Sequence, residues 1–212
     1  MTGPDVLRYA QVHRCGTVLA GTAVVAVLSA FFGGTHIALP SIGSAGVTTG
    51  VPFRQDLPLL TAVFLSAALD GAMAAHDAMG ASTMHRFRIM YCTALTTTVC
   101  VFSFGTEALA NGPGPGIVFV RSVLIWLGLA LLSVRLLGQQ LSWVIPLISV
   151  LFLVWYPGNW WDWTANPATD PFGWVVAVVA LTVGVAAVAA TPWRRKTSFS
   201  MRKPPVREST MW

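Results

Sequence analysis

Charged residues are scarce in this chain, and their scarcity excludes most soluble folds. Only 10% of the 212 residues are Asp, Glu, Lys or Arg, whereas 55% are hydrophobic. A soluble domain carries about 25% charged residues, so this chain lacks the polar groups to cover a water-facing surface. The mean hydropathy of +0.67 agrees with this reading. The composition predicts an integral membrane protein and argues against a soluble enzyme, a nucleic-acid-binding module or a secreted disulfide scaffold.

Cysteine and metal-binding patterns are also lacking. Of the three cysteines, Cys92 and Cys100 lie on one expected helix, roughly 12 Å apart along its axis, which is too far for a disulfide. Cys15 lies beside another apolar run. The chain has no zinc-ligand spacing, no phosphate-binding loop and no hydrolase motif. We therefore expect no catalytic site, metal or cofactor, with ATP entering only through a partner.

Six apolar segments are present, and each approaches the length of a transmembrane helix. Such a helix needs about 20 mostly apolar residues. The segments are 15–32, 57–75, 89–109, 117–137, 141–156 and 171–190. The expected fold is all-α, with a six-helix multi-pass transmembrane domain over residues 15–190. A leader at 1–14 precedes this domain, and a basic tail at 191–212 follows it and is expected to be disordered.

Basic residues are distributed unevenly over the connections between these segments. With the N-terminus inside, eleven of the thirteen Lys and Arg residues fall on inside segments, and only Arg54 and Arg121 fall outside. Inside segments of membrane proteins carry an excess of Lys and Arg. We therefore expect both termini to be cytoplasmic and the protein to lie in the cell (plasma) membrane. Six basic residues belong to the tail, which predicts contact with anionic lipid and no role for nucleic acid.

The connections differ in character. The first outside connection, residues 33–56, is rich in Gly, Thr and Ser and is interrupted by prolines. This composition predicts an irregular segment that covers the outer end of the helical bundle, which we call the outer mouth. Residues 111–116 predict a tight turn between the third and fourth helices, because Gly and Pro alternate there.

In the second expected helix, small residues recur at four-residue spacing at Ala67 and Gly71. That spacing lets helices approach closely, so we expect the second helix to be central.

Two charged residues fall inside the expected helices on either side of the 111–116 turn. Glu107 and Arg121 lie at similar distances from its centre, roughly 10 Å below the end of the helical hairpin. Isolated charge inside a bilayer is costly, so we predict an intramembrane ion pair between the two. The pair would be either a structural clip or part of a gate or substrate anchor near the outer mouth.

Two carboxylates lie near the inner end of the second helix. Asp70 and Asp77 are seven residues apart, so they share a face if the helix continues. They are candidate inner-mouth carboxylates that would act with His76 as a proton relay or cation site. The alternative is surface pairing with Arg86, Arg88 or Arg135.

The longest inside connection, residues 76–88, combines apolar and basic side chains. Ser82 is placed to cap a short helix beginning there. Methionine and aromatic side chains beside charge suit a partner groove. Its candidate ATPase-docking residues are Met79, Met84, His85, Arg86, Phe87 and Arg88.

Several of these segments together resemble a known family. They are Val51–Leu60 before the second helix, the His85–Arg88 cluster, Arg121, and Leu127–Leu147 followed by a Trp-rich loop. Over roughly residues 50–190 the chain resembles short six-span actinobacterial membrane proteins that are grouped with ABC-exporter permeases. The resemblance implies a permease subunit that pairs with a separate ABC ATPase and forms a homodimer or heterodimer with a second permease.

The same resemblance implies two functional connections. Residues 76–88 stand where such permeases dock their ATPase, and residues 157–170 stand where they carry an outer insertion. Two other functions remain open from the residues themselves. One is a proton-coupled secondary transporter that uses Asp70 or Glu107, and the other is a non-transporting membrane scaffold or sensor that acts through its tail.

Overall fold

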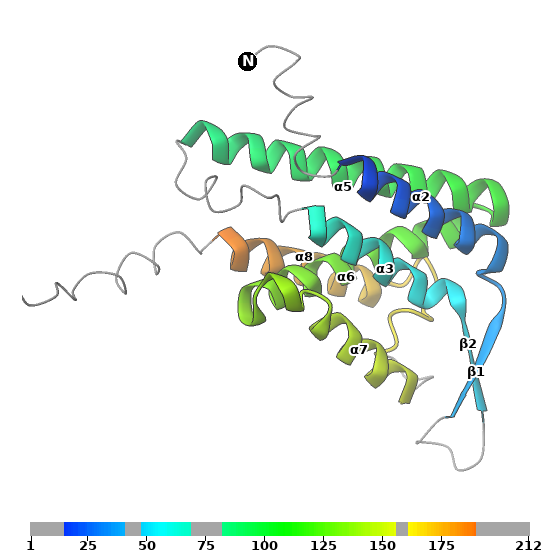
Figure 1. Cartoon of the computed structure of the whole chain (residues 1–212). Helices are drawn as coiled ribbons and strands as arrows, with labels where there is room; N and C mark the ends of the chain where they lie inside the picture. The colour runs from blue at the N-terminus through cyan, green and yellow to red at the C-terminus, as the bar shows by residue number, and fades with distance from the viewer. Residues whose placement is uncertain (1–14, 41–47, 69–81, 156–160, 190–212) are drawn as a thin grey trace, which may run out of the picture.

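The structure is a computed structural model that describes residues 15–40, 48–68, 82–155 and 161–189 (Figure 1). The described chain is a helical bundle with one small β-hairpin. Its elements, in chain order, are α2 (Cys15–Phe32), β1 (His36–Pro40), β2 (Thr48–Pro52), α3 (Phe53–Ala68), α5 (Ser82–Asn111), α6 (Pro113–Leu137), the 3-10 helix η1 (Gln139–Leu141), α7 (Val144–Trp155) and α8 (Pro171–Ala189).

Four of the helices are long and apolar enough to cross a membrane. They are α2, α6, α8 and the Ile89–Asn111 part of α5, which supports the expected membrane protein. The described parts of α3 and α7 have 16 and 12 residues, or roughly 24 and 18 Å at 1.5 Å per residue. A bilayer core is about 30 Å thick. The expected second span, 57–75, extends past Ala68 into residues outside the described ranges.

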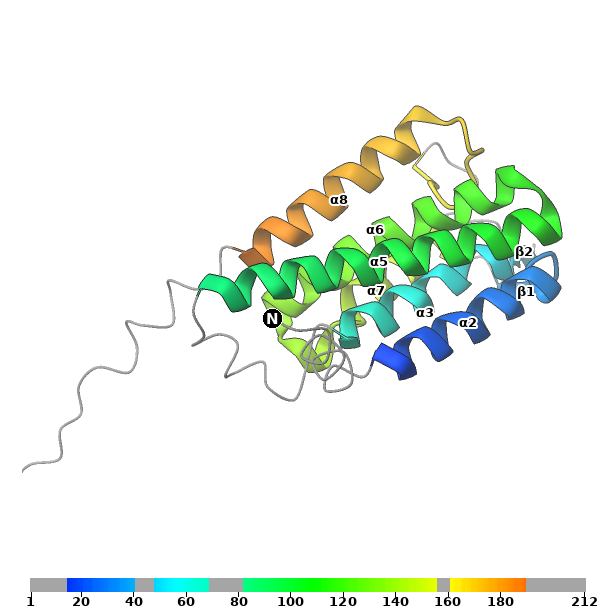
Figure 2. The same ribbon diagram turned by 90° about the horizontal axis from the view of Figure 1, so that it is seen from above.

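Helix α6 lies at the centre of the bundle (Figure 2). It packs against α3, α5, α7 and α8, while α2 packs against α3 and α5. Within its span 61% of the residues are buried, compared with 17–28% for the other three candidate spans. The expectation that the second helix would be central rather than lipid-exposed agrees with the described part of α3, which packs against both α2 and α6. Over residues 57–68 only Leu60 and Ala67 are exposed, although the closest helix packing occurs elsewhere.

Two glycines produce that close packing, between α6 and α8. A methyl group on Gly128 would lie only 2.4 Å from the backbone carbonyl of Ala180, and one on Gly184 would lie 2.4 Å from the carbonyl oxygen of Gly128. Small residues allow helix backbones to approach in this way inside a membrane. These two glycines therefore fix α8 against the central helix.

The expected irregular cover at 33–56 is instead partly a β-hairpin. Strands β1 and β2 pair antiparallel, with His36 opposite Pro52 and Pro40 opposite Thr48. Proline is tolerated at strand ends and on edge strands, and both prolines here are terminal strand residues. The hairpin projects from one end of the bundle, together with the α5–α6 turn and the 161–170 loop (Figures 1 and 2). We call this the hairpin end.

The tight turn predicted between the third and fourth helices is confirmed. Only Gly112 separates α5 from α6, and its φ of +92° is one that residues with a Cβ adopt rarely. Its amide donates to the carbonyl of Ala108 at 3.1 Å, and Pro113 begins the next helix. Proline suits that first helical position because its absent N–H would have no partner there.

Candidate functional site

The main polar site of the hairpin end is built around Arg121 of α6. This side chain is fully buried. Its Nη1 donates to the carbonyl of Pro167 at 2.8 Å, and Nη2 donates to the carbonyls of Trp163 at 2.8 Å and Asn166 at 2.7 Å. Hydrogen bonds from a charged donor are about twice as strong as neutral ones. Arg121 therefore holds the 161–170 loop onto the central helix.

The loop is also ordered by its own carboxylates, of which Asp162 is the first. Its Oδ1 accepts hydrogen bonds from the hydroxyl of Thr164 at 2.6 Å and from the amides of Thr164 and Ala165 at 3.2 and 3.3 Å. An aspartate that binds the backbone two or three residues ahead closes a local turn. This turn directs the Trp163 carbonyl toward Arg121.

Asp170 orders the other side of the loop by capping α8. Its Oδ2 accepts from the Gly173 amide at 2.9 Å and from the Asn166 side chain at 2.8 Å. These bonds, first among them the one from Gly173, lower the pKa of Asp170, and the charge of Arg121 lowers it further. Because Asp is a preferred N-cap and Pro171 follows at the first helical position, the sequence here favours a helix start.

Close packing seals Arg121 beneath the loop. A methyl group on Gly173 would lie 2.7 Å from its Nη1, so α8 has to present a glycine at this point. Trp163 is buried, and its ring meets that of Trp126 edge to face, with centroids 4.5 Å apart. Such aromatic pairs add about 0.5–1.5 kcal/mol beyond the area that they bury. The site is thus a closed clamp around a structured loop.

A third carboxylate of the hairpin end lies at the start of α3. Asp56, which precedes the expected span 57–75, is partly buried. Burial and, to a smaller extent, the negative charge of Asp162 raise its pKa from 3.8 to about 6. The hairpin end therefore contains a carboxyl group that titrates in a mildly acidic medium.

Glu107 belongs to a separate polar cluster that joins α5 to α2. Its side chain is fully buried, and it accepts a short hydrogen bond from the hydroxyl of Ser29, which is also buried. It also accepts from Asn111 at 3.1 Å, and the same Asn111 amide lies 3.4 Å from the carbonyl of Ala30. We call Ser29, Glu107 and Asn111 the α2–α5 latch.

The structure thus separates the two charges that the sequence suggested as a pair. The described hydrogen bonds of Glu107 go to α2 and to its own helix, whereas those of Arg121 go to loop carbonyls. Three loop carbonyl oxygens accept hydrogen bonds from the guanidinium at 2.7–2.8 Å, so backbone groups stabilise the charge of Arg121 where a carboxylate was expected.

The other predicted site residues lie at or beyond the edges of the described ranges. Asp70, Asp77 and Met79 fall within residues 69–81, outside those ranges. The first turns of α5 contain Met84, His85, Arg86, Phe87 and Arg88. This helix begins at Ser82 as expected, but it has 30 residues and is not the short helix that was expected there. These five residues therefore lie on a helix that continues into a candidate span, at the end of the bundle opposite the hairpin (Figure 1).

The roles of Asp162, Asp170 and Gly173 were not predicted from the sequence. A detectable signal existed for one of them, because Asp170-Pro171 has the form of an N-cap followed by proline. Within the described ranges, no group of three or more His, Cys, Asp or Glu residues is arranged to hold a metal ion. No protein-family model matches this chain, and no curated protein or solved structure is significantly similar to it.

Proposed function

We propose that this chain is the permease subunit of an ABC-type exporter, with six membrane crossings, both termini inside and a separate ATPase as partner. The hairpin end would then face outward. In support, the six described helices alternate in direction along the bundle (Figures 1 and 2), and eleven of thirteen basic residues fall on one side of such a topology. The 161–170 loop would be the outer insertion.

The observation that carries the proposal is the length of α5. This helix has 30 residues, of which Ile89–Asn111 form the candidate span. The seven residues from Ser82 to Arg88 would extend roughly 10 Å beyond the span, at 1.5 Å per residue. A docking element that continues into a membrane helix without a break can transmit movement of the ATPase directly to the bundle.

The far end of α5 shows where such movement would arrive. Helix α5 packs against the central helix α6 and against α2. Near its other end Glu107 and Asn111 form the α2–α5 latch. A displacement of residues 82–88 would therefore act on the contact between α2 and α5 roughly 40 Å away along the helix.

Co-purification with a defined ATPase tests the proposal. The tagged full chain is co-expressed with a candidate ABC ATPase from the same organism and purified in detergent with ATP, ADP or no nucleotide. We expect a complex whose yield depends on nucleotide, and we expect the double variant Met84→Ser, Phe87→Ser to lose it while still inserting into the membrane.

The matched control replaces apolar residues at another turn of the same end. Leu141 and Trp143 are exposed there, at 41% and 45%, and their replacement by serine should leave the complex intact. Loss of the complex in this control but not in the α5 variant would move the docking site away from α5. Failure of the unmodified chain to bind the ATPase under any nucleotide condition would overturn the proposed function.

A second candidate function, proton-coupled transport, is favoured by one observation. Glu107 is a fully buried carboxyl inside a candidate span, and intramembrane ionisable residues often carry protons. Glu107→Gln preserves the shape of the side chain and removes the carboxyl group. Under this second function, transport would require a proton gradient and would be lost in that variant, whereas the exporter needs only the ATPase.

A further inference from the structure

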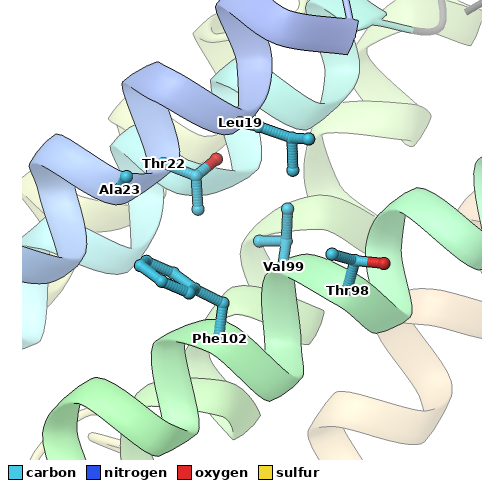
Figure 3. Close-up of a pocket in the computed structure, with 6 residues that line it drawn as sticks. All are labelled: Leu19, Thr22, Ala23, Thr98, Val99 and Phe102. Carbon is cyan, nitrogen blue, oxygen red and sulfur yellow. The ribbon is translucent and has the colours of Figure 1, made fainter.

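A groove lies between α2 and α5 (Figure 3). Its volume is about 300 Å³, at the lower limit of the volumes of ligand pockets, roughly 300–1,000 Å³. Three residues of each helix form its walls: Leu19, Thr22, Ala23, Thr98, Val99 and Phe102.

These residues lie at the midpoints of two candidate spans. Residues 19–23 are near the centre of Cys15–Phe32, and residues 98–102 are at the centre of Ile89–Asn111. The groove would therefore open near the bilayer midplane, where the ends of acyl chains lie, roughly 15 Å from either interface. Water and water-soluble molecules do not reach this depth from the lipid side.

The two hydroxyl donors of the walls are already used within their own helices. Thr22 donates its hydroxyl to the Val18 carbonyl at 2.8 Å, and Thr98 donates to the Ala94 carbonyl at 2.8 Å. Both bonds stay within their own helices, so the surface toward the groove is methyl, methylene and aromatic. Val99 is fully buried at the floor, while Phe102 is 46% exposed at the rim. Such an uncharged wall complements a hydrocarbon chain, and water needs two or more polar partners.

The groove is closed at the hairpin end by the α2–α5 latch. Ser29 of the latch lies seven residues beyond Thr22 on α2, roughly 10 Å along the axis. Polar contact holds the two helices together there, whereas at residues 19–23 the small side chain of Ala23 leaves them apart (Figure 3). Because its walls come from two neighbouring candidate spans, the groove would open sideways, into the hydrocarbon region.

We propose that this groove binds the terminal part of one acyl chain of a membrane lipid. Between lipid and protein the driving force is van der Waals contact, because lipid tails are as apolar as the groove itself. If the groove is empty, the residues that line it lose those contacts. A chain end fills it at the depth where chain ends are available. The site does not depend on the proposed transport function.

Photo-cross-linking tests the site. The full chain is placed in nanodiscs of phosphatidylglycerol that carries a diazirine near the end of one acyl chain. Cross-linked peptides are then mapped by mass spectrometry. We expect cross-links at residues 19–23 and 98–102 to exceed those on the exposed face of α8. A diazirine close to the glycerol should not label these two segments.

Filling variants with matched controls make the test decisive. Ala23→Leu occupies the groove and should reduce its labelling to the level of the remaining lipid-facing surface. Ala20→Leu makes the same change one turn away, outside the groove, and should leave the labelling unchanged. Thr98→Leu and Thr97→Leu repeat the comparison on α5 in case one filled variant fails to fold. Uniform labelling of all lipid-facing helices, or equal labelling in the filled and control variants, would overturn the proposal.

Discussion

Replacing Arg121 by methionine should release the 161–170 loop from the bundle. The change removes three charge-assisted hydrogen bonds of 2.7–2.8 Å and leaves the carbonyls of Trp163, Asn166 and Pro167 without this donor. Each such bond contributes about 1.5–3 kcal/mol. Two of them are only partly buried, so water can replace part of the loss. The substitution also removes the free-energy cost of burying the charged guanidinium, which offsets a further part of the loss. A net destabilisation of about 3–5 kcal/mol follows.

Thiol labelling of the purified protein measures this release locally. In a variant without native cysteines, Thr164→Cys places a thiol in the loop at a position that is only 7% exposed. Maleimide should react slowly with it when Arg121 is present and rapidly in the Arg121→Met variant. Arg121→Lys should give an intermediate rate, because one ammonium group cannot reproduce the fork of a guanidinium.

An exposed arginine on the same helix is the control for this experiment. Arg135→Met makes the same chemical change near the other end of α6 and should alter stability by less than about 0.5 kcal/mol. The reasoning is refuted if Arg121→Met leaves both the thermal unfolding temperature and the protection of position 164 as they were.

Three further predictions follow from the same structure. The changes in the free energy of unfolding caused by Glu107→Gln and by Arg121→Met should add within about 0.5 kcal/mol in a double-mutant cycle, whereas an ion pair between the two residues would give a coupling energy well above that. Because the pKa of Asp56 is raised from 3.8 to about 6, its protonated form favours the folded state, and stability should fall as pH rises through about 6. Asp56→Asn should abolish this fall, which is about 1–2 kcal/mol after allowance for partial exposure, in unfolding curves between about pH 4 and 8. Gly128→Ala should destabilise by about 1–3 kcal/mol, because its Cβ would meet the backbone of α8, while Gly105→Ala, with open space around it, should be neutral or slightly stabilising.

Features that depend on neighbouring residues could be predicted from the sequence. The apolar runs indicated the helices, Ser82 marked the start of α5, and the Gly-Pro repeat marked the turn at Gly112. Each signal arises from residues within one or two turns of each other. The count of charged residues likewise sufficed to predict a membrane protein.

Features that depend on distant residues could not be predicted in this way. Arg121 was expected to pair with Glu107 because only Asp and Glu carry a carboxylate, so such a partner can be identified in the sequence. A backbone carbonyl is present in every residue, so the sequence does not indicate which one will accept a hydrogen bond from Arg121. Which carbonyls meet Arg121 depends on how the 161–170 loop folds back over α6. The pairing of β1 with β2 and the contact of Gly128 with Gly184 are non-local for the same reason.

The most direct test of the central proposal is to measure on which side of the membrane each connection between helices lies. Residues 82–88 can meet an ATPase only if they lie inside the cell. Single cysteines at Pro113 and Ala165, both exposed at the hairpin end, are compared with one at Gln140, at the opposite end, in intact cells. An impermeant maleimide should label positions 113 and 165 directly and position 140 only after permeabilisation. Labelling of position 140 in intact cells, or protection of position 113, would contradict the six-crossing topology and the docking of an ATPase on α5.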